Sequence, residues 1–249
     1  MPSTPVFSPT GYEELMRAIQ TGGYGFSEFG KSATGEGRVL LRHDIDKHIG
    51  YALEMARMEH RLGVRAHYFF LLHCPLYNIM EPESWHAIQE IHQLGHVIGL
   101  HCDERRIPGP EKELDAGVLA DLKWLNTVFT FAQPVVSFHN PSEKVICRKG
   151  SGYVSAYDPA FWMPETKYIS DSNQRFREEE LIQKLKCREW PRLQILIHPL
   201  WWFSEGKPVF SIIQDVVAQR AAYIDAYLIY SNHVWNKTKS GNGEGRATL

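Results

Sequence analysis

The chain has 249 residues, of which 43% are hydrophobic and 22% are charged, so it can bury a sizeable core. Length permits one large domain or two small ones, and we expect one. The formal net charge of -2 gives no basic field of the kind that nucleic-acid binding usually needs, so no nucleic-acid partner is expected.

The first part of the chain alternates between helix and strand patterns. A short helical pattern at residues 12–20 precedes a glycine-rich stretch, 21–37, that predicts a loop. There follow a strand at 39–43, a helix at 49–62, a strand at 66–72 and a helix at 82–94. Gly63 and Gly95 stand where the two helices end.

The same alternation continues to the end of the chain. The patterns predict a strand at 97–101, a long helix at 111–131, a strand at 135–139, weaker strands at 153–156 and 168–170, a charged helix at 178–186, a strong strand at 193–198 and a helix at 209–230. This order predicts an α/β fold with a mostly parallel sheet, either open or closed into a barrel. In such folds, functional groups collect at the carboxyl ends of the strands.

Three parts are expected: an N-terminal helix and glycine-rich loop at 1–37, one globular domain at 38–235, and a disordered tail at 236–249. The four cysteines form no CxxC pair, which argues against a structural zinc module or a disulfide scaffold. The N-terminus lacks the pattern of a signal peptide, and no apolar run is long enough to cross a membrane. We therefore expect a cytoplasmic location and no integral membrane segment.

Chemically active side chains stand where four of the strand patterns end. Asp44 and Asp46 follow the first, and His101, His139 and His198 end three others. Strand alternation places the two carboxylates on one side, which is costly without a cation. Carboxylate and imidazole together can hold zinc with an open position for water. A lone histidine at a strand end is more often structural, and Asp46 can instead cap the next helix, but the coincidence at several ends favours a metal site.

The order of these motifs resembles the NodB-homology polysaccharide deacetylases, carbohydrate esterase family 4. The likeness is greater to their divergent WbmS-like branch, whose pattern Arg-His-Asp-x-Asp matches Arg42-His43-Asp44-Ile45-Asp46. It spans residues 39–201 and makes 38–235 a deacetylase-like catalytic domain. The resemblance implies a distorted (β/α) barrel of about seven mostly parallel strands and metal-dependent hydrolysis of an N-acetyl or related acyl group.

The resemblance also implies roles for single residues. Asp44 takes the place of the general base, Asp46 that of the metal-binding aspartate, and His101 that of the first metal histidine. Asp171, within Ile169-Ser170-Asp171-Ser172, resembles the aspartate that orients other catalytic groups, and His198, within Leu196-Ile197-His198-Pro199, resembles the general acid.

One position departs from the family pattern. The second metal histidine normally follows the first by four residues, but Arg105 stands there. His139 is the candidate third ligand because it replaces the family's usual arginine at a strand end, and Asp103 and Glu104 are held in reserve. If none of them serves, the site has lost its metal.

The resulting expectation is a metal-dependent hydrolase with a divalent metal, zinc first, that acts on an acylated amino sugar or glycan precursor. Asp44 removes a proton from water, and His198, oriented by Asp171, donates one to the leaving amine. The alternatives are a carbohydrate-binding protein with a degenerate site and a metal-dependent hydrolase of another amide. The oligomeric state is not indicated.

Three further residues have open readings. His43 either hydrogen-bonds a carboxylate of the site or is buried and structural. Trp201 and Trp202 either form a platform that stacks on a sugar or belong to the core.

Overall fold

The structure is a computed structural model, which describes residues 4–31, 36–107, 109, 111–162 and 165–241. The chain divides into two compact units, Met1–Lys207 and Pro208–Leu249. The sequence patterns instead placed the last boundary after residue 235.

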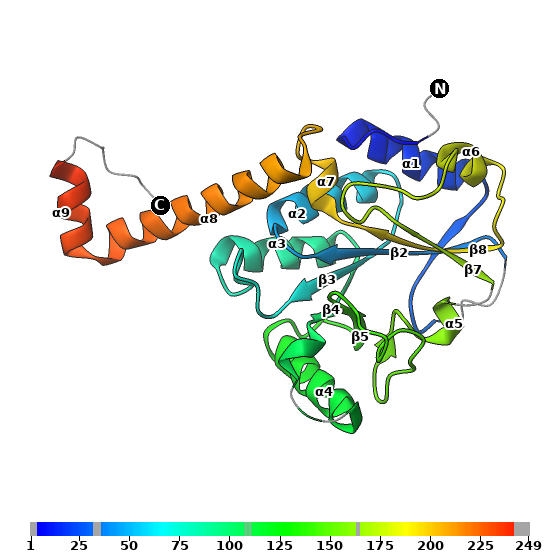
Figure 1. Cartoon of the computed structure of the whole chain (residues 1–249), viewed down its shortest axis with the longest axis horizontal. Coiled ribbons are helices and arrows are strands. Elements are labelled where there is room, and N and C mark those ends of the chain that lie inside the picture. The colour runs from blue at the N-terminus through cyan, green and yellow to red at the C-terminus, as the bar shows by residue number, and fades with distance from the viewer. Residues whose placement is uncertain (1–3, 32–35, 108, 110, 163–164, 242–249) are drawn as a thin grey trace. The chain divides into compact units, whose positions relative to one another are not determined.

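A parallel sheet forms the centre of the first unit (Figure 1). Its described strands are β1 (Gly25–Ser27), β2 (Arg38–Ile45), β3 (His67–Leu71), β4 (Val97–Cys102), β5 (Val135–Phe138), β6 (Val154–Ser155), β7 (Thr166–Ser170) and β8 (Arg192–Ile197). Seven of them lie in the order β6-β5-β4-β3-β2-β8-β7, and β1 pairs with the start of β2. Because β2 lies between β3 and β8, it is buried along nearly its whole length, as expected for a central parallel strand.

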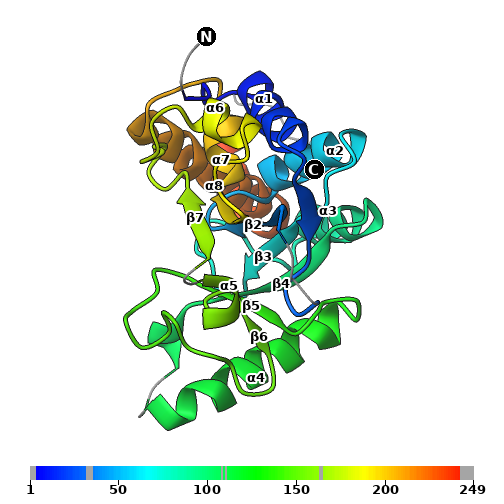
Figure 2. The ribbon, with the colours of Figure 1, turned by 90° about the vertical axis from the view of Figure 1, so that its right-hand side faces the viewer.

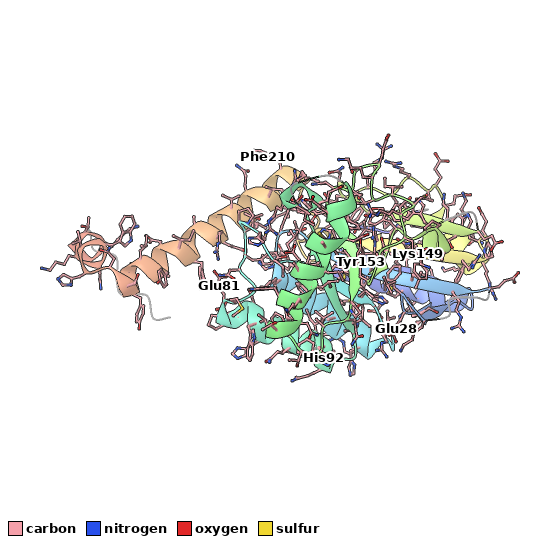
Figure 3. All side chains as sticks on the ribbon, turned by 90° about the horizontal axis from the view of Figure 1, so that it is seen from below. Glu28, Glu81, His92, Lys149, Tyr153 and Phe210 are labelled. Carbon is pink, nitrogen blue, oxygen red and sulfur yellow. The ribbon has the colours of Figure 1, made fainter. Side chains whose placement is uncertain are left out.

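Helices connect and cover these strands. The first unit contains α1 (Pro9–Thr21), α2 (Ile49–Arg61), α3 (Pro82–Gln93), the 3-10 turn η1 (Glu104–Arg106), α4 (Glu111–Val128), α5 (Pro159–Trp162), α6 (Leu181–Lys186) and α7 (Pro199–Trp202). Figure 2 shows α1, α2, α3, α6 and α7 gathered on one side, with α4 beyond β5 and β6. Tyr153, labelled in Figure 3, lies against α4 and donates a hydrogen bond to Asp115 at 2.8 Å.

Local signals explain where two helices begin. Ser8 caps α1, because its hydroxyl accepts a hydrogen bond from the Gly11 N–H, and Pro9 occupies the first turn. The cap of α2 is His48, whose Nδ1 accepts from the Tyr51 N–H at 3.2 Å. The capping role considered for Asp46 therefore falls to His48, and the Asp46 carboxylate is left for other contacts.

The sheet curls strongly. Strands in a sheet lie about 4.8 Å apart, so β5, the third neighbour of β2, would lie roughly 14 Å away from it in a flat sheet. Instead, Oγ of Ser137 on β5 lies 2.8 Å from Oδ2 of Asp44 on β2. Two short side chains can meet in this way only if the sheet bends into a trough. The predicted distorted barrel of parallel strands is therefore confirmed, and it is open, because the described parts of β6 and β7 do not pair.

The structure differs from the sequence patterns in detail. The glycine-rich stretch contains β1, whose three residues pair with Arg38, Val39 and Leu40, while residues 32–35 lie outside the described chain. The charged helix begins at Leu181 rather than at residue 178. A three-residue strand is stabilised by its neighbour, which a local pattern does not reveal.

The second unit consists of α8 (Val209–Ser231) and α9 (His233–Gly241), and Phe210 of α8 is exposed (Figure 3). Asn232 caps α9 through the Trp235 N–H, and the Trp235 indole donates to Asp225 at 2.9 Å. These contacts continue helix to residue 241, where a disordered tail from 236 was expected; residues 242–249 of that tail lie outside the described chain. Among the described helices none has both the length and the hydropathy needed to cross a membrane.

Gly99 provides a test of the packing inside the trough. A Cβ at this position would lie 2.7 Å from both the Phe69 ring and the Val135 side chain. We expect Gly99→Ala to lower the free energy of unfolding by about 1–3 kcal/mol through overpacking, measured by urea denaturation. Gly25→Ala is the matched control, because its nearest neighbour would lie at 3.6 Å. Equal stability of the two variants would contradict the packing described here.

Candidate functional site

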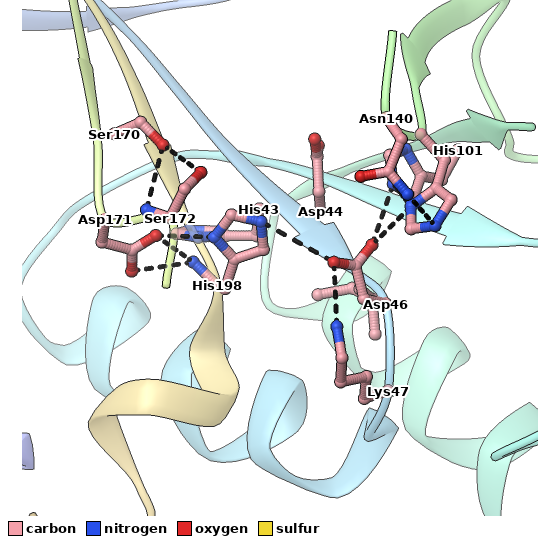
Figure 4. Close-up of polar contacts among 12 residues, drawn as sticks. His43, Asp44, Asp46, Lys47, His101, Asn140, Ser170, Asp171, Ser172 and His198 are labelled. Carbon is pink, nitrogen blue, oxygen red and sulfur yellow. Dashed lines mark hydrogen bonds and ion pairs between the residues drawn. The ribbon is translucent and has the colours of Figure 1, made fainter. Parts of the chain in front are cut away.

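Four side chains lie close together at the carboxyl ends of parallel strands, and Figure 4 labels three of them, Asp46, His101 and His198. Asp46 follows β2, His101 lies near the end of β4, His139 follows β5, and His198 follows β8. Parallel pairing brings these ends to the same edge of the sheet, and the curl turns them toward one another. The structure thus brings together the residues that the strand-end pattern singled out.

Asp46, His101 and His139 form the tightest part of this group. Oδ1 of Asp46 lies 3.0 Å from Nε2 of His101 and 3.0 Å from Nδ1 of His139. The two nitrogens are 3.2 Å apart. Ligands of a tetrahedral ion with bonds of about 2.0–2.1 Å lie roughly 3.3 Å from one another. One carboxylate and two imidazoles at these separations therefore fit a divalent transition metal.

Each imidazole also has a hydrogen bond on the side away from Asp46. Nδ1 of His101 lies 3.0 Å from the carbonyl oxygen of Ser137 and donates to it, so Nε2 is the nitrogen that faces Asp46 and that would bind a metal. Nε2 of His139 lies 3.0 Å from the side-chain amide of Asn140. The amide nitrogen of Asn140 donates to this Nε2, so Nδ1 carries the ring proton and donates it to Asp46, and a metal bound at Nδ1 would displace that proton.

Charges inside the group affect its protonation. Burial alone raises the pKa of Asp46, but hydrogen bonds from His101 and His139 outweigh it and hold the pKa well below its usual value. Burial alone lowers the pKa of His101, yet the carboxylates of Asp44 and Asp46 raise it above the ordinary histidine value. A metal that binds here must displace the proton of His101, so metal affinity is expected to fall as the pH falls.

Asp44 lies beside this group in a different environment. It is almost fully buried, and its Oδ2 accepts from the Ser137 hydroxyl at 2.8 Å, while its Oδ1 has no hydrogen-bond partner among the described residues. The fully buried guanidinium of Arg42 lies 3.9 Å from Oδ2 and donates to Ser137 and to Tyr157, each at 3.0 Å. Arg42 thus balances the charge of Asp44, and Oδ1 remains available as an acceptor.

His198 and Asp171 form a second pair at the edge of the site. Asp171 is fully buried and accepts from Nδ1 of His198 at 2.6 Å, from the His198 N–H and from the Trp202 indole at 2.8 Å. Nε2 of His198 points back to Oδ2 of Asp46 at 3.8 Å. Burial alone lowers the pKa of His198, but the Asp171 carboxylate outweighs it, and the pKa is raised. The imidazole is therefore held as a proton donor whose Nε2 faces the site.

A narrow cleft opens between these groups. It is lined by Asp44, Asp46, Lys47, His198 and Trp201, among others, and its volume of about 10 Å³ suits a water molecule or an ion rather than a sugar. Lys47, which the sequence reasoning did not single out, lies 3.4 Å from Oδ2 of Asp46.

The structure also decides between the alternatives that the sequence left for the third metal ligand and for His43. Arg105 is exposed and pairs with Asp103 at 2.7 Å, and Glu104 accepts from Ser142, so neither alternative ligand joins the group of Asp46, His101 and His139.

His43 turns to the opposite face of β2, where Nε2 contacts the buried Glu59 at 2.8 Å. The sequence reasoning also missed Arg42, Ser137 and Tyr157; the arginine beside His43 in Arg-His-Asp-x-Asp was the one available signal.

Of the two alternatives for Trp201 and Trp202, the structure favours the core, because both side chains are buried. Trp202 is fully buried, and its indole donates to Asp171, so it supports the site from the core. Trp201 is also buried but contributes to the wall of the narrow cleft.

The sequence matches no known family model and no curated protein. Among the solved structures that are similar to the chain are two deacetylases, each at 15% sequence identity. The chitin deacetylase of Colletotrichum lindemuthianum matches with a TM-score of 0.43 over 80% of this chain and 86% of its own. The catalytic domain of the peptidoglycan N-acetylglucosamine deacetylase of Eubacterium rectale matches with a TM-score of 0.44 over 78% and 89%. At these TM-scores the similarity is partial and concerns the path of the backbone.

The arrangement of Asp46, His101 and His139 predicts the metal content of the protein. Protein purified without added metal or a metal-binding tag is expected to hold about one divalent transition-metal ion per chain, and His101→Ala or His139→Ala should remove it. Elemental analysis measures this, with Asp103→Asn as the control that keeps the metal. Metal retained in His139→Ala but lost in Asp103→Asn would assign the third ligand to Asp103.

Proposed function

We propose that this protein is a metal-dependent hydrolase that removes an N-acetyl or related acyl group from an amino sugar or glycan precursor. One observation carries the proposal: Asp46, His101 and His139, which could hold a metal ion, lie beside a buried carboxylate with a free oxygen, Asp44, and an imidazole held as a proton donor, His198. Amide hydrolysis needs these three functions on one substrate.

Asp44 is the proposed general base. Its Oδ1 is free to take a proton from a water molecule, while Ser137 and Arg42 hold Oδ2 and fix the direction of the carboxylate. The Arg42 guanidinium, 3.9 Å from Oδ2, places a positive charge next to this buried carboxylate.

His198 is the proposed general acid. Asp171 accepts a hydrogen bond from the Nδ1–H of His198. The Nε2 proton then points into the site, where it is available to the leaving amine. Asp171 also accepts hydrogen bonds from the main-chain N–H of His198 and from the Trp202 indole, which fix the position of its carboxylate. The imidazole therefore cannot rotate away without losing its hydrogen bond to Asp171. The metal, when bound through Asp46, His101 and His139, supplies Lewis-acid polarisation of the scissile carbonyl.

The choice of an acylated sugar as substrate rests on the motif resemblance to polysaccharide deacetylases described above, because a fold alone does not fix a substrate. The order Asp44-x-Asp46, His101, Asp171 and His198 supports it, and His139 is the proposed third ligand because Arg105 occupies the position of the family's second metal histidine. Hydrolysis of another amide, such as a cyclic imide or ureide, uses the same groups and is tested beside it.

The division of labour between the two aspartates can be tested directly. Asp44→Asn should lower kcat on an N-acetylated amino sugar by about 10²–10⁴-fold with the metal retained, because only the proton acceptor is lost. Asp46→Ala should lose both activity and metal. Amine release and elemental analysis on the same preparations measure the two properties.

Either of two results would reject this assignment. One is an active Asp46→Ala protein without metal. The other is a metal-loaded wild-type protein that releases no amine from a panel of acyl sugars but opens cyclic imides or ureides.

The raised pKa of His198 predicts a pH dependence. A general acid works in its protonated form, so kcat should fall as the pH rises through its pKa, above the ordinary histidine value of about 6.5. Asp171→Asn removes the main charge that raises this pKa, so the alkaline fall should move to lower pH. Trp202→Phe, which removes one donor to Asp171 and leaves its charge, is the control. An unchanged profile in Asp171→Asn would exclude His198 as the acid.

A further inference from the structure

A second, much larger cavity runs along β7 and the segment after it. Its volume is about 960 Å³, which is in the range of sites for small molecules and exceeds the narrow cleft at Asp46 by far. Its polar lining includes Lys167, Tyr168, Ser170, Ser172, Arg175 and Arg177. Among the described strands β7 pairs only with β8, so this cavity lies at an edge of the sheet.

The charge of this cavity is positive, although the whole chain has a formal net charge of -2. Glu178 is the acidic residue in its lining, and it is neutralised by Lys167 at 3.0 Å. Arg175 and Arg177 are exposed, and their guanidinium groups make no ion pair or hydrogen bond with any described residue. Two uncompensated guanidinium groups in one lining with serine hydroxyls suit an oxyanion, since arginine binds phosphate and carboxylate through paired N–H groups.

The cavity adjoins the proposed proton donor. Ser170 and Ser172 flank Asp171 in the chain, and their hydroxyl oxygens lie 2.8 Å apart (Figure 4). Asp171 in turn holds Nδ1 of His198 at 2.6 Å. The cavity is therefore joined to the proposed proton donor through Asp171, which stands between two residues of its lining.

The segment that carries the arginines is anchored to the same aspartate. The N–H of Arg175 donates to the main-chain oxygen of Asp171 at 3.3 Å. Between them, Asn173 and Gln174 have φ angles of 58° and 57°, in the left-handed region that costs non-glycine residues energy. The turn returns the chain toward Asp171 and places Arg175 beside Ser172 in the wall of the cavity.

We propose that this cavity binds an oxyanion, a phosphate or a carboxylate, carried by the sugar whose acyl group the neighbouring site removes. The inference rests on the proposed function for the sugar and on Arg175 and Arg177 for the anion. It makes the substrate a negatively charged amino-sugar derivative rather than a neutral chitin-like chain.

Binding of sugars that lack an amide tests the anion site without relying on catalysis. Isothermal calorimetry of the metal-loaded protein with glucose 1-phosphate, glucuronic acid and glucose compares a phosphate, a carboxylate and a neutral ring. We expect at least one anionic sugar to bind about tenfold more tightly than glucose or better. Arg175→Ala and Arg177→Ala should each remove about tenfold of that preference, Arg175→Lys should retain part of it, and exposed Arg61, replaced by alanine, is the matched control.

The outcomes separate the possible results. Tighter binding of glucose 1-phosphate assigns a phosphate, and tighter binding of glucuronic acid assigns a carboxylate. Equal binding of all three sugars, or anion binding that survives in both alanine variants and so reports the metal, would overturn the inference. A preference lost in both variants of a protein that deacylates no sugar would support the anion site and reject the proposed deacylase.

Discussion

This site depends on one constraint: two aspartates lie on the same side of the chain at the end of β2. Asp44 and Asp46 repel each other, and burial makes the repulsion stronger, so positive groups or donors must surround them. The fold supplies separate partners for each: Arg42 and Ser137 for Asp44, and two imidazoles and Lys47 for Asp46. This separation allows one carboxylate to bind a cation while the other keeps an oxygen free.

The trough shape of the sheet makes these partners available. β5 supplies both the Ser137 hydroxyl that holds Asp44 and the Ser137 carbonyl that fixes the proton of His101. On the other side of β2, β8 and β7 bring His198 against Asp171, and the buried Trp202 indole donates a hydrogen bond to Asp171. In a flat sheet these groups would lie too far apart to act on one amide. The curvature is therefore as necessary to the proposed chemistry as the ligands.

Hydrophobic patterning predicted most of the fold correctly, because seven of the strands and the longer helices are continuous apolar or amphipathic segments. It failed where stability comes from a partner far away or from a local cap. Gly25–Ser27 is a strand because β2 offers it hydrogen bonds, and α9 extends to residue 241 after the Asn232 cap. Neither contact leaves a periodic mark in its own segment.

By itself, the sequence determined which side chains stand at strand ends and therefore which residues, Asp44, Asp46, His101, His139 and His198, meet at one edge of a parallel sheet. Only the tertiary structure decided which partners they contact. It placed His139 rather than Asp103 or Glu104 beside Asp46, turned His43 to Glu59, and set Arg42 against Asp44. The physical reason is that strand alternation fixes the direction of a side chain, whereas its partners depend on the curvature that joins distant strands.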